Sequence, residues 1–185
     1  IASALDNLGV DYIEAGWPGA NPTDTEFFQK KHNLKNSKLT SFGMTKRSGR
    51  SAENDTGLSA LMNSNTSAVC LVGKSWDFHV DVALGITNEE NLDNISESAK
   101  HFIKAKKEFM FDAEHFFDGY KANSKYALSC IKAAYDQGAR WIVLCDTNGG
   151  TLPHEVSQIV TEVSKVVPGK NLGIHAHNDT GNAVA

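Results

Sequence analysis

The sequence lacks any apolar run that approaches the roughly 18 residues of a membrane-spanning helix. It also lacks a charged start followed by an apolar core, which is the pattern of a secretion signal. Both absences lead us to expect a cytoplasmic protein with no membrane partner.

Cysteine is scarce, and the three in the chain are Cys70, Cys130 and Cys145. Their number is odd, their spacing is wide and apolar residues flank each of them, so neither a disulfide framework nor a cysteine zinc site is indicated. We predict buried, reduced thiols. Catalytic use of Cys145, which lies close to a predicted strand end, is the alternative.

A strong excess of charge is also absent. The net charge is -4 and the pI is about 6.0. Basic residues cluster only at 45–50 and 104–107, where we expect solvated loop or helix faces, so the sequence argues against a nucleic-acid-binding surface. With 185 residues, 41% of them hydrophobic, the chain is long enough for one domain with a sizeable core.

Strand-like and helix-like patterns alternate along the whole chain, with strand starts roughly 30 residues apart, the length of one strand–helix unit. Strands are predicted near 11–16, 38–43, 68–73, 107–113, 140–145 and 171–176. Helices are predicted near 23–34, 54–64, 88–105, 123–137 and 153–166, after a first helical stretch that stops at Gly9. Strands joined through helices must run parallel.

Polar residues lie at or just after the carboxyl end of nearly every predicted strand. They are Glu14, Ser41, Lys74, Ser75, Glu114, Asp146, Thr147, His175 and His177. A barrel gathers many strand ends at one mouth, whereas an open doubly wound sheet usually carries a Gly-rich phosphate loop, and none is present here. We therefore predict an α/β fold of the TIM-barrel type. Since a complete barrel takes about 250 residues, residues 1–185 are expected to be a partial catalytic domain with six of eight units.

The stretch "NLGIHAHND" ends a predicted strand on His175 and His177. Residues two apart on a strand share a face, so the two imidazoles converge on one volume. The companions Asn178, Asp179, Asp146 and Glu114 occupy equivalent strand ends and favour a divalent metal such as Mg, Mn, Zn, Co or Fe. Two polar residues at a solvent-exposed strand end are the alternative interpretation.

Three further side chains are candidates for catalysis. Glu114, set among aromatic residues, could orient a substrate or transfer a proton, or instead cap the next helix. His79 could bind a substrate carboxylate or be an ordinary helix residue. Thr147 offers a hydroxyl, but like Asp146 it could cap the following turn.

Five ordered motifs, spread over nearly the whole chain, carry a family resemblance: "YIEAGWPGANPTDTEFF", "GKSWDFHVDVALG", "FDAEHFFDGYKAN", "LCDTNGGTLP" and "IHAHND". Together they resemble the metal-dependent acyl-CoA condensing enzymes that include the 2-isopropylmalate, homocitrate and citramalate synthases. The resemblance is greatest to the citramalate synthases, through "GWPGANPTDTEFF" and "DGYKAN".

The resemblance implies a barrel in which a divalent metal binds a 2-oxo acid, here pyruvate, while acetyl-CoA supplies the carbon nucleophile. It implies an acyltransferase of branched-chain amino-acid biosynthesis, expected as a homodimer when full-length. Matched residue by residue, it assigns His175 and His177 as metal ligands, Thr147 as the hydroxyl on the substrate carboxylate, Glu114 as the acid of the oxo-acid pocket, and His79 as a pocket residue.

Two parts of the family pattern are missing: a first strand with an Arg-Asp pair, and a late Asn ligand. With about two of four protein ligands absent, we expect this segment alone neither to close a barrel nor to turn over substrate. The alternatives are a 2-isopropylmalate or homocitrate synthase, a related metal-dependent lyase or aldolase, and a noncatalytic metal-binding barrel.

Overall fold

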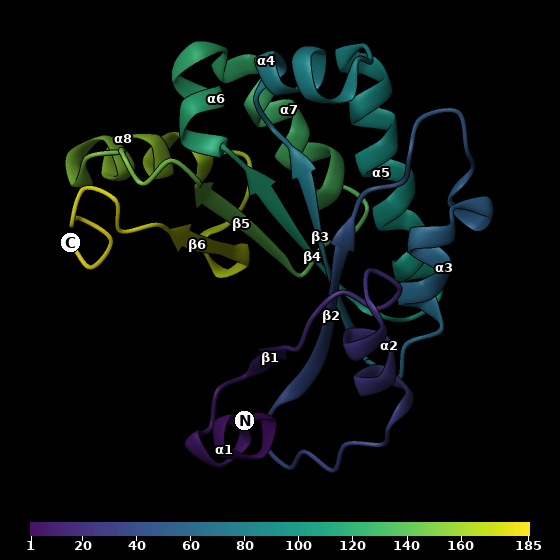
Figure 1. The fold of residues 1–185 in the computed structure, drawn as a ribbon. Coiled ribbons are helices and arrows are strands. Elements are labelled where there is room, and N and C mark those ends of the chain that lie inside the picture. The colour runs from purple at the N-terminus through teal and green to yellow at the C-terminus, as the bar shows by residue number, and fades with distance from the viewer.

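Six parallel strands form one sheet in the computed structural model, which describes residues 1–185 (Figure 1). Each strand pairs with the next along the chain, in the order β1-β2-β3-β4-β5-β6. The strands are β1 (Tyr12–Glu14), β2 (Lys38–Met44), β3 (Ala68–Lys74), β4 (Glu108–Glu114), β5 (Trp141–Asp146) and β6 (Leu172–Ala176). All six predicted strands are confirmed. β1 and β6 each have a neighbour on one side only, so the sheet is an open part of a barrel.

Helices connect successive strands and pack against the outer face of the sheet (Figure 1). They are α1 (Ala2–Leu8), α2 (Pro22–Gln29), α3 (Thr56–Met62), α4 (Asp77–His79), α5 (Asn88–Lys104), α6 (Phe116–Ala122), α7 (Ser124–Tyr135) and α8 (Pro153–Val163), with short 3-10 turns η1 (Ala52–Asn54) and η3 (Gly169–Asn171) and a π-helix η2 (Val80–Leu84). No helix is both long enough and apolar enough to cross a membrane.

Local signals set most helix ends where the sequence predicts them. The α5 helix begins with a capping box, in which Thr87 accepts a hydrogen bond from the Glu90 N–H and the Glu90 carboxylate accepts one from the Thr87 N–H. Pro153 occupies the first turn of α8. Gly9 ends α1 in the left-handed conformation, with φ 86°.

Two predicted helices differ most from their expected ranges. The helix predicted at 23–34 ends at Gln29, because Lys30 is extended and the His32 ring instead contacts the Phe27 carbonyl at 2.8 Å. The helix predicted at 54–64 is divided, because Asp55 is extended and its carboxylate caps α3 by accepting from the Leu58 N–H.

Alternation along the strands separates two faces of the sheet. Outward side chains such as Leu71, Phe111 and Leu144 are fully or almost fully buried against the helices and form the main core. Burial of each such side chain contributes roughly 1.5–3 kcal/mol. The face toward the barrel interior is more polar, and the Tyr12 hydroxyl and the Lys38 ammonium both donate hydrogen bonds to Glu108 at its lower end.

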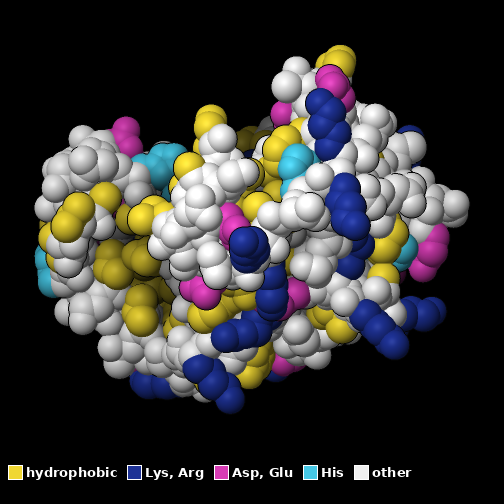
Figure 2. Space-filling view, turned by 90° about the horizontal axis from the view of Figure 1, so that it is seen from below, with side chains coloured by type: hydrophobic (Ala, Val, Ile, Leu, Met, Phe, Trp, Pro, Cys, Tyr) yellow, Lys and Arg dark blue, Asp and Glu magenta, His cyan; other side chains and the backbone are white.

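The outer side of β6 is less covered than that of the other strands. The Ile174 side chain is 54% exposed. Seen from below, hydrophobic side chains gather in a hollow on the side where β6 and α8 lie, whereas Lys and Arg side chains are mixed with acidic ones over the rest of that face (Figure 2). Of the two basic clusters, Arg47, Arg50, Lys104 and Lys106 are exposed as expected, whereas Lys46 is buried and Lys107 is half-buried, so the expectation of solvated faces is confirmed only in part.

All three cysteines are free and buried, which confirms the prediction of reduced, buried thiols. Cys130 lies in α7 on the side that faces the main core. Burial raises the pKa of the Cys130 thiol to about 12. This thiol therefore behaves as a small apolar side chain.

Candidate functional site

The carboxyl ends of the strands bring together the histidine pair that the sequence singles out. His175 is in β6 and His177 follows it, and the centroids of their rings are 5.0 Å apart. Both side chains are exposed on the open side of the sheet. The two imidazoles share a face, as the strand alternation predicts, and their role as metal ligands stays a prediction.

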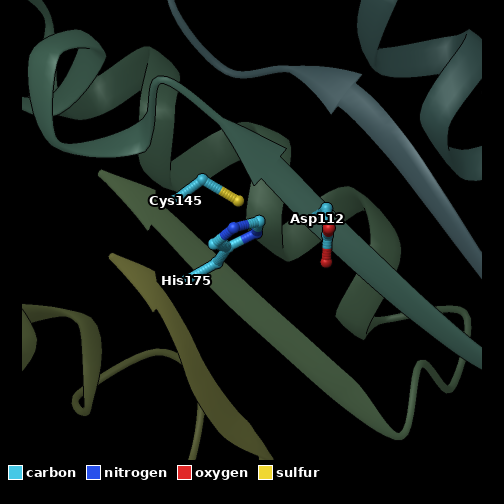
Figure 3. Close-up of side chains that lie close together, drawn as sticks. All are labelled: Asp112, Cys145 and His175. Atoms are coloured by element: carbon cyan, nitrogen blue, oxygen red, sulfur yellow. The ribbon is translucent and has the colours of Figure 1, made fainter. Parts of the chain in front are cut away.

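A second group of side chains lies one layer deeper on the same face. The ligand atoms of Asp112, Cys145 and His175, from the adjacent strands β4, β5 and β6, all lie within 4.8 Å of one another. Figure 3 shows the three side chains projecting from neighbouring strands toward a common volume. Imidazole nitrogen, carboxylate oxygen and thiol sulfur are donors that divalent metals accept in proteins, so this group could hold a metal ion.

Sequence reasoning did not select Asp112, and it considered Cys145 only as an alternative catalytic thiol and not as a neighbour of His175, although a signal was present. Each lies two residues before a predicted site residue, Glu114 and Thr147 respectively, and two-residue spacing on a strand keeps side chains on one face. The residue two positions before each strand-end residue therefore belongs to the deeper layer of the same face.

Burial disfavours charge in this layer. Desolvation raises the pKa of Asp112 above its usual value, and desolvation together with the nearby Asp112 carboxylate raises the pKa of Glu14. Desolvation, reinforced by the carboxylates of Asp112, Glu114 and Glu14, also raises the pKa of the Cys145 thiol. A nucleophilic cysteine needs a lowered pKa, so this environment does not support the alternative in which Cys145 attacks the substrate.

Glu114 lies at the end of β4, where its side chain faces Lys74 at the end of β3. The two residues are partners in the parallel register, and the Lys74 ammonium donates a hydrogen bond to Glu114 Oε2. The residue at the start of α6 is His115, and no side chain caps that helix. The structure therefore gives no support to the interpretation of Glu114 as a helix cap.

His79 ends α4 and lies in a group of aromatic rings at the mouth. Its ring centroid is 4.4 Å from that of His115, in an edge-to-face arrangement, and 4.8 Å from that of Trp76. Desolvation, then the neighbouring His115 and Lys74, lower the pKa of His79. The lowered pKa favours the neutral form of His79, in which one ring nitrogen donates a hydrogen bond and the other accepts one.

His115 is a residue that sequence reasoning did not select. Its backbone adopts the left-handed conformation, with φ 54°, which is uncommon for a residue with a side chain. Its N–H donates to Thr147 Oγ1 at 2.9 Å, and its Nδ1 lies 3.4 Å from Asp118 Oδ2, which also accepts from Asn148 Nδ2 at 3.0 Å. Thr147 thus joins the ends of β4 and β5, and the local backbone strain coincides with the candidate site.

Some of the predicted companions have local structural partners instead. Asp146 points to the outer side of β5, where its two carboxylate oxygens accept hydrogen bonds from the Thr151 N–H and hydroxyl, at 3.1 and 2.8 Å. Asp146 therefore caps the following turn, as the alternative interpretation held. Asn178 Oδ1 accepts from the Ala183 N–H at 3.2 Å. Asp179 packs against Gly149 of the turn after β5.

Ser41 is not at the mouth, because β2 continues beyond it to Met44. It is fully buried, and its hydroxyl lies 3.2 Å from those of Ser64 and Thr66. It forms a buried polar contact between β2 and the loop that leads to β3.

A cavity of about 510 Å³ opens beside the mouth, between the loops that follow β1 and β2. Its apolar wall includes Trp17, Met44 and Leu84, and Arg47 and Lys46 supply positive charge. The Lys46 ammonium is already paired with Glu97, at 3.0 Å, whereas the Arg47 side chain is exposed. A bulky ligand with an anionic end fits this combination of walls.

Solved structures show the fold, and curated relatives show sequence similarity over the entire chain. Hydroxymethylglutaryl-CoA lyase from Pseudomonas aeruginosa matches with a TM-score of 0.81 at 15% identity, over 100% of this chain and 61% of that chain, which shows the barrel fold alone. An (R)-citramalate synthase of Aquifex aeolicus is 52% identical over 187 residues, and a homocitrate synthase of Saccharolobus islandicus is 31% identical over 185 residues.

Both alignments cover 100% of this chain but only 35% and 39% of the relatives, so the chain spans little more than a third of their length. The sequence profile of the HMGL-like family matches residues 1–185. This match over the entire chain means that the chain belongs to the HMGL-like family.

Proposed function

We propose that the protein containing this chain condenses acetyl-CoA with pyruvate to form citramalate, in branched-chain amino-acid biosynthesis. The observation that carries the proposal is the 52% identity to an (R)-citramalate synthase over the entire chain, combined with the convergence of His175 and His177 on the inner face. The 31% identity to a homocitrate synthase makes that activity the weaker candidate.

His175 and His177 would hold a divalent cation, with the remaining ligands supplied from outside residues 1–185. The donor set fits, because both imidazoles are free of hydrogen bonds to other residues and share one face. A bound cation supplies Lewis-acid polarisation of the keto group. The identity of the metal, among Mg, Mn, Zn and Co, is not fixed by imidazole ligands.

Thr147 is suited to bind the carboxylate of the oxo acid. Its oxygen already accepts a hydrogen bond from the His115 N–H, so its own proton is free for donation to an anionic oxygen. Glu114 lies on the other side of the mouth with its charge balanced by Lys74, which permits an anionic substrate to approach. Neutral His79 would donate or accept a hydrogen bond at the same mouth.

Acetyl-CoA would occupy the cavity of about 510 Å³ beside the mouth. The exposed guanidinium of Arg47 would pair with its phosphates, since Arg binds phosphate oxygens in a bidentate way. The thioester end would then lie toward the strand ends, where the oxo acid binds. We also propose that the full-length protein is a homodimer.

The test is release of free CoA thiol from acetyl-CoA by the full-length protein, with pyruvate, 2-oxoisovalerate or 2-oxoglutarate as the acceptor. We expect release with pyruvate, and its loss in His175→Ala and His177→Ala. His154→Ala, at an exposed histidine of α8, is the matched control and should retain activity.

Other outcomes reassign the protein. Release with 2-oxoisovalerate alone means an isopropylmalate synthase, and release with 2-oxoglutarate alone means a homocitrate synthase. Cleavage of a hydroxyacyl-CoA without condensation means a lyase. Metal binding with no turnover of any acceptor means a noncatalytic barrel, and full activity without both imidazoles removes the proposed site.

A further inference from the structure

The deeper layer of the barrel places two donor residues that the proposed condensation does not use, Asp112 and Cys145, beside His175, which it does use. Neither nitrogen of His175 has a hydrogen-bond partner in the protein, and Cys145 Sγ makes one long contact, 3.8 Å to the Val143 carbonyl. Asp112 Oδ1 accepts a hydrogen bond from Cys70 Sγ at 3.3 Å, which leaves Oδ2 free. One nitrogen, one sulfur and one oxygen are therefore available to a ligand in the same small volume.

The strands fix these three residues relative to one another. Cys145 and His175 are direct partners in the register of β5 and β6. Asp112 pairs with Val143, two residues before Cys145, so its side chain lies on the same face of the next strand. Sites built on strands hold their geometry better than sites on loops, so the cluster is preorganised.

We propose that Asp112, Cys145 and His175 form a metal site of their own, one layer below the His175–His177 pair, which binds a thiophilic divalent cation such as Zn²⁺ or Co²⁺. Three protein ligands of the types N, O and S leave a fourth tetrahedral position for water or another small ligand. Sulfur favours Zn²⁺ and Co²⁺ over Mg²⁺, which prefers oxygen ligands.

The site would compete with the proposed function for His175. The His175 imidazole belongs to both groups, because its ligand atom lies within 4.8 Å of those of Asp112 and Cys145 while its ring centroid lies 5.0 Å from that of His177. A thiophilic cation in the deeper site therefore takes His175 away from the His175–His177 pair. Mg²⁺ prefers oxygen ligands, so it does not compete for this site. This consequence rests on the proposed function, but binding at the site does not.

The test is titration of the metal-free, full-length protein with Co²⁺ while the near-ultraviolet absorption is recorded. We expect a thiolate-to-cobalt charge-transfer band, which is present in the wild type and absent in Cys145→Ala. Cys130→Ala, at a buried thiol outside the cluster, is the matched control and should keep the band. Asp112→Asn should keep the band but weaken Co²⁺ binding about 10-fold or more.

Absence of the band in a folded wild-type protein, or its survival in Cys145→Ala, overturns the proposal. Circular dichroism of each variant separates loss of the ligand from loss of the fold. If Cys145→Ala does not fold, ¹¹³Cd NMR of the wild type reports directly whether sulfur is a ligand. Because no turnover is needed, a missing condensation activity leaves this inference standing, and a missing band leaves the proposed function standing.

Discussion

Lys74 and Glu114 form a hydrogen-bonded ion pair across neighbouring strands at the mouth of the barrel. The side chains are 17% and 25% exposed, so water screens the pair only in part. Lys74 lies in the motif "GKSWDFHVDVALG", and no sequence pattern predicted its pairing with Glu114. The pairing balances the charge of Glu114, which the proposed binding of an oxo-acid carboxylate beside it requires.

Replacing Lys74 with Met should weaken binding of the oxo acid. The change leaves the Glu114 carboxylate unpaired beside the substrate carboxylate, and we expect KM for the oxo acid to rise about 10-fold or more, which corresponds to about 1.4 kcal/mol. Steady-state kinetics with varied oxo acid measure the effect. In the double variant with Glu114→Gln the repulsion is gone, so KM should fall back toward the value of Glu114→Gln alone. Additive effects of the two changes would contradict this account.

Replacing Thr147 with Val removes a hydroxyl while nearly conserving volume. The His115 N–H loses its acceptor and the substrate carboxylate loses a donor, so we expect kcat/KM for the oxo acid to fall about 10-fold or more. Thr147→Ser should retain most of the activity. Thr161→Val, at an exposed position of α8, is the control for the same chemical change. Equal activity of Thr147→Val and Thr161→Val would show that this hydroxyl does not bind substrate.

The sheet was predictable because parallel strands and their connecting helices leave a periodic pattern that depends little on tertiary detail. The helices α4 and α6 were not predicted. Both follow directly after a strand end, and α6 starts from a left-handed His115 whose conformation depends on Thr147, 32 residues away. A contact of that range leaves no local signal.

Of the candidate site, only the outermost residues could be predicted from the sequence. His175 and His177 were identified because a repeated residue type at two-residue spacing is visible in one strand. The grouping of Asp112 and Cys145 with His175 was overlooked because it depends on the register between strands, which the sequence does not display. Asp146 was selected as a companion of the histidine pair, but its side chain points to the outer face. It lies one residue after Cys145 on β5, and consecutive side chains of a strand point to opposite faces.

Asp112 should make stability depend on pH in a defined direction. Burial raises the pKa of its carboxyl above the usual 3.8, so the folded state holds the proton more tightly than the unfolded state. The carboxyl therefore imposes no penalty below about pH 3.8, and folding loses stability as the pH rises through the raised value. We expect Asp112→Asn to be more stable than the wild type toward urea at pH 7, and the difference to shrink on acidification. Greater stability of the wild type at pH 7, measured without metal, would contradict this.

Gly149 should be required in the turn after β5. Its φ is +62°, and an added Cβ would lie 2.4 Å from Asp179 Oδ2 and 3.0 Å from the Asp179 backbone nitrogen. We expect Gly149→Ala to lower the free energy of unfolding by about 1–3 kcal/mol, because both the left-handed conformation and the contact with Asp179 oppose a side chain. Gly150→Ala is the matched control, since no atom lies within 4 Å of a Cβ there and its φ is not in the left-handed region. Urea denaturation compares the two, and equal midpoints would show that the segment 178–180 moves aside without cost. Loss of activity in Gly149→Ala beyond the loss of folded protein would indicate that this turn also positions the segment behind His177.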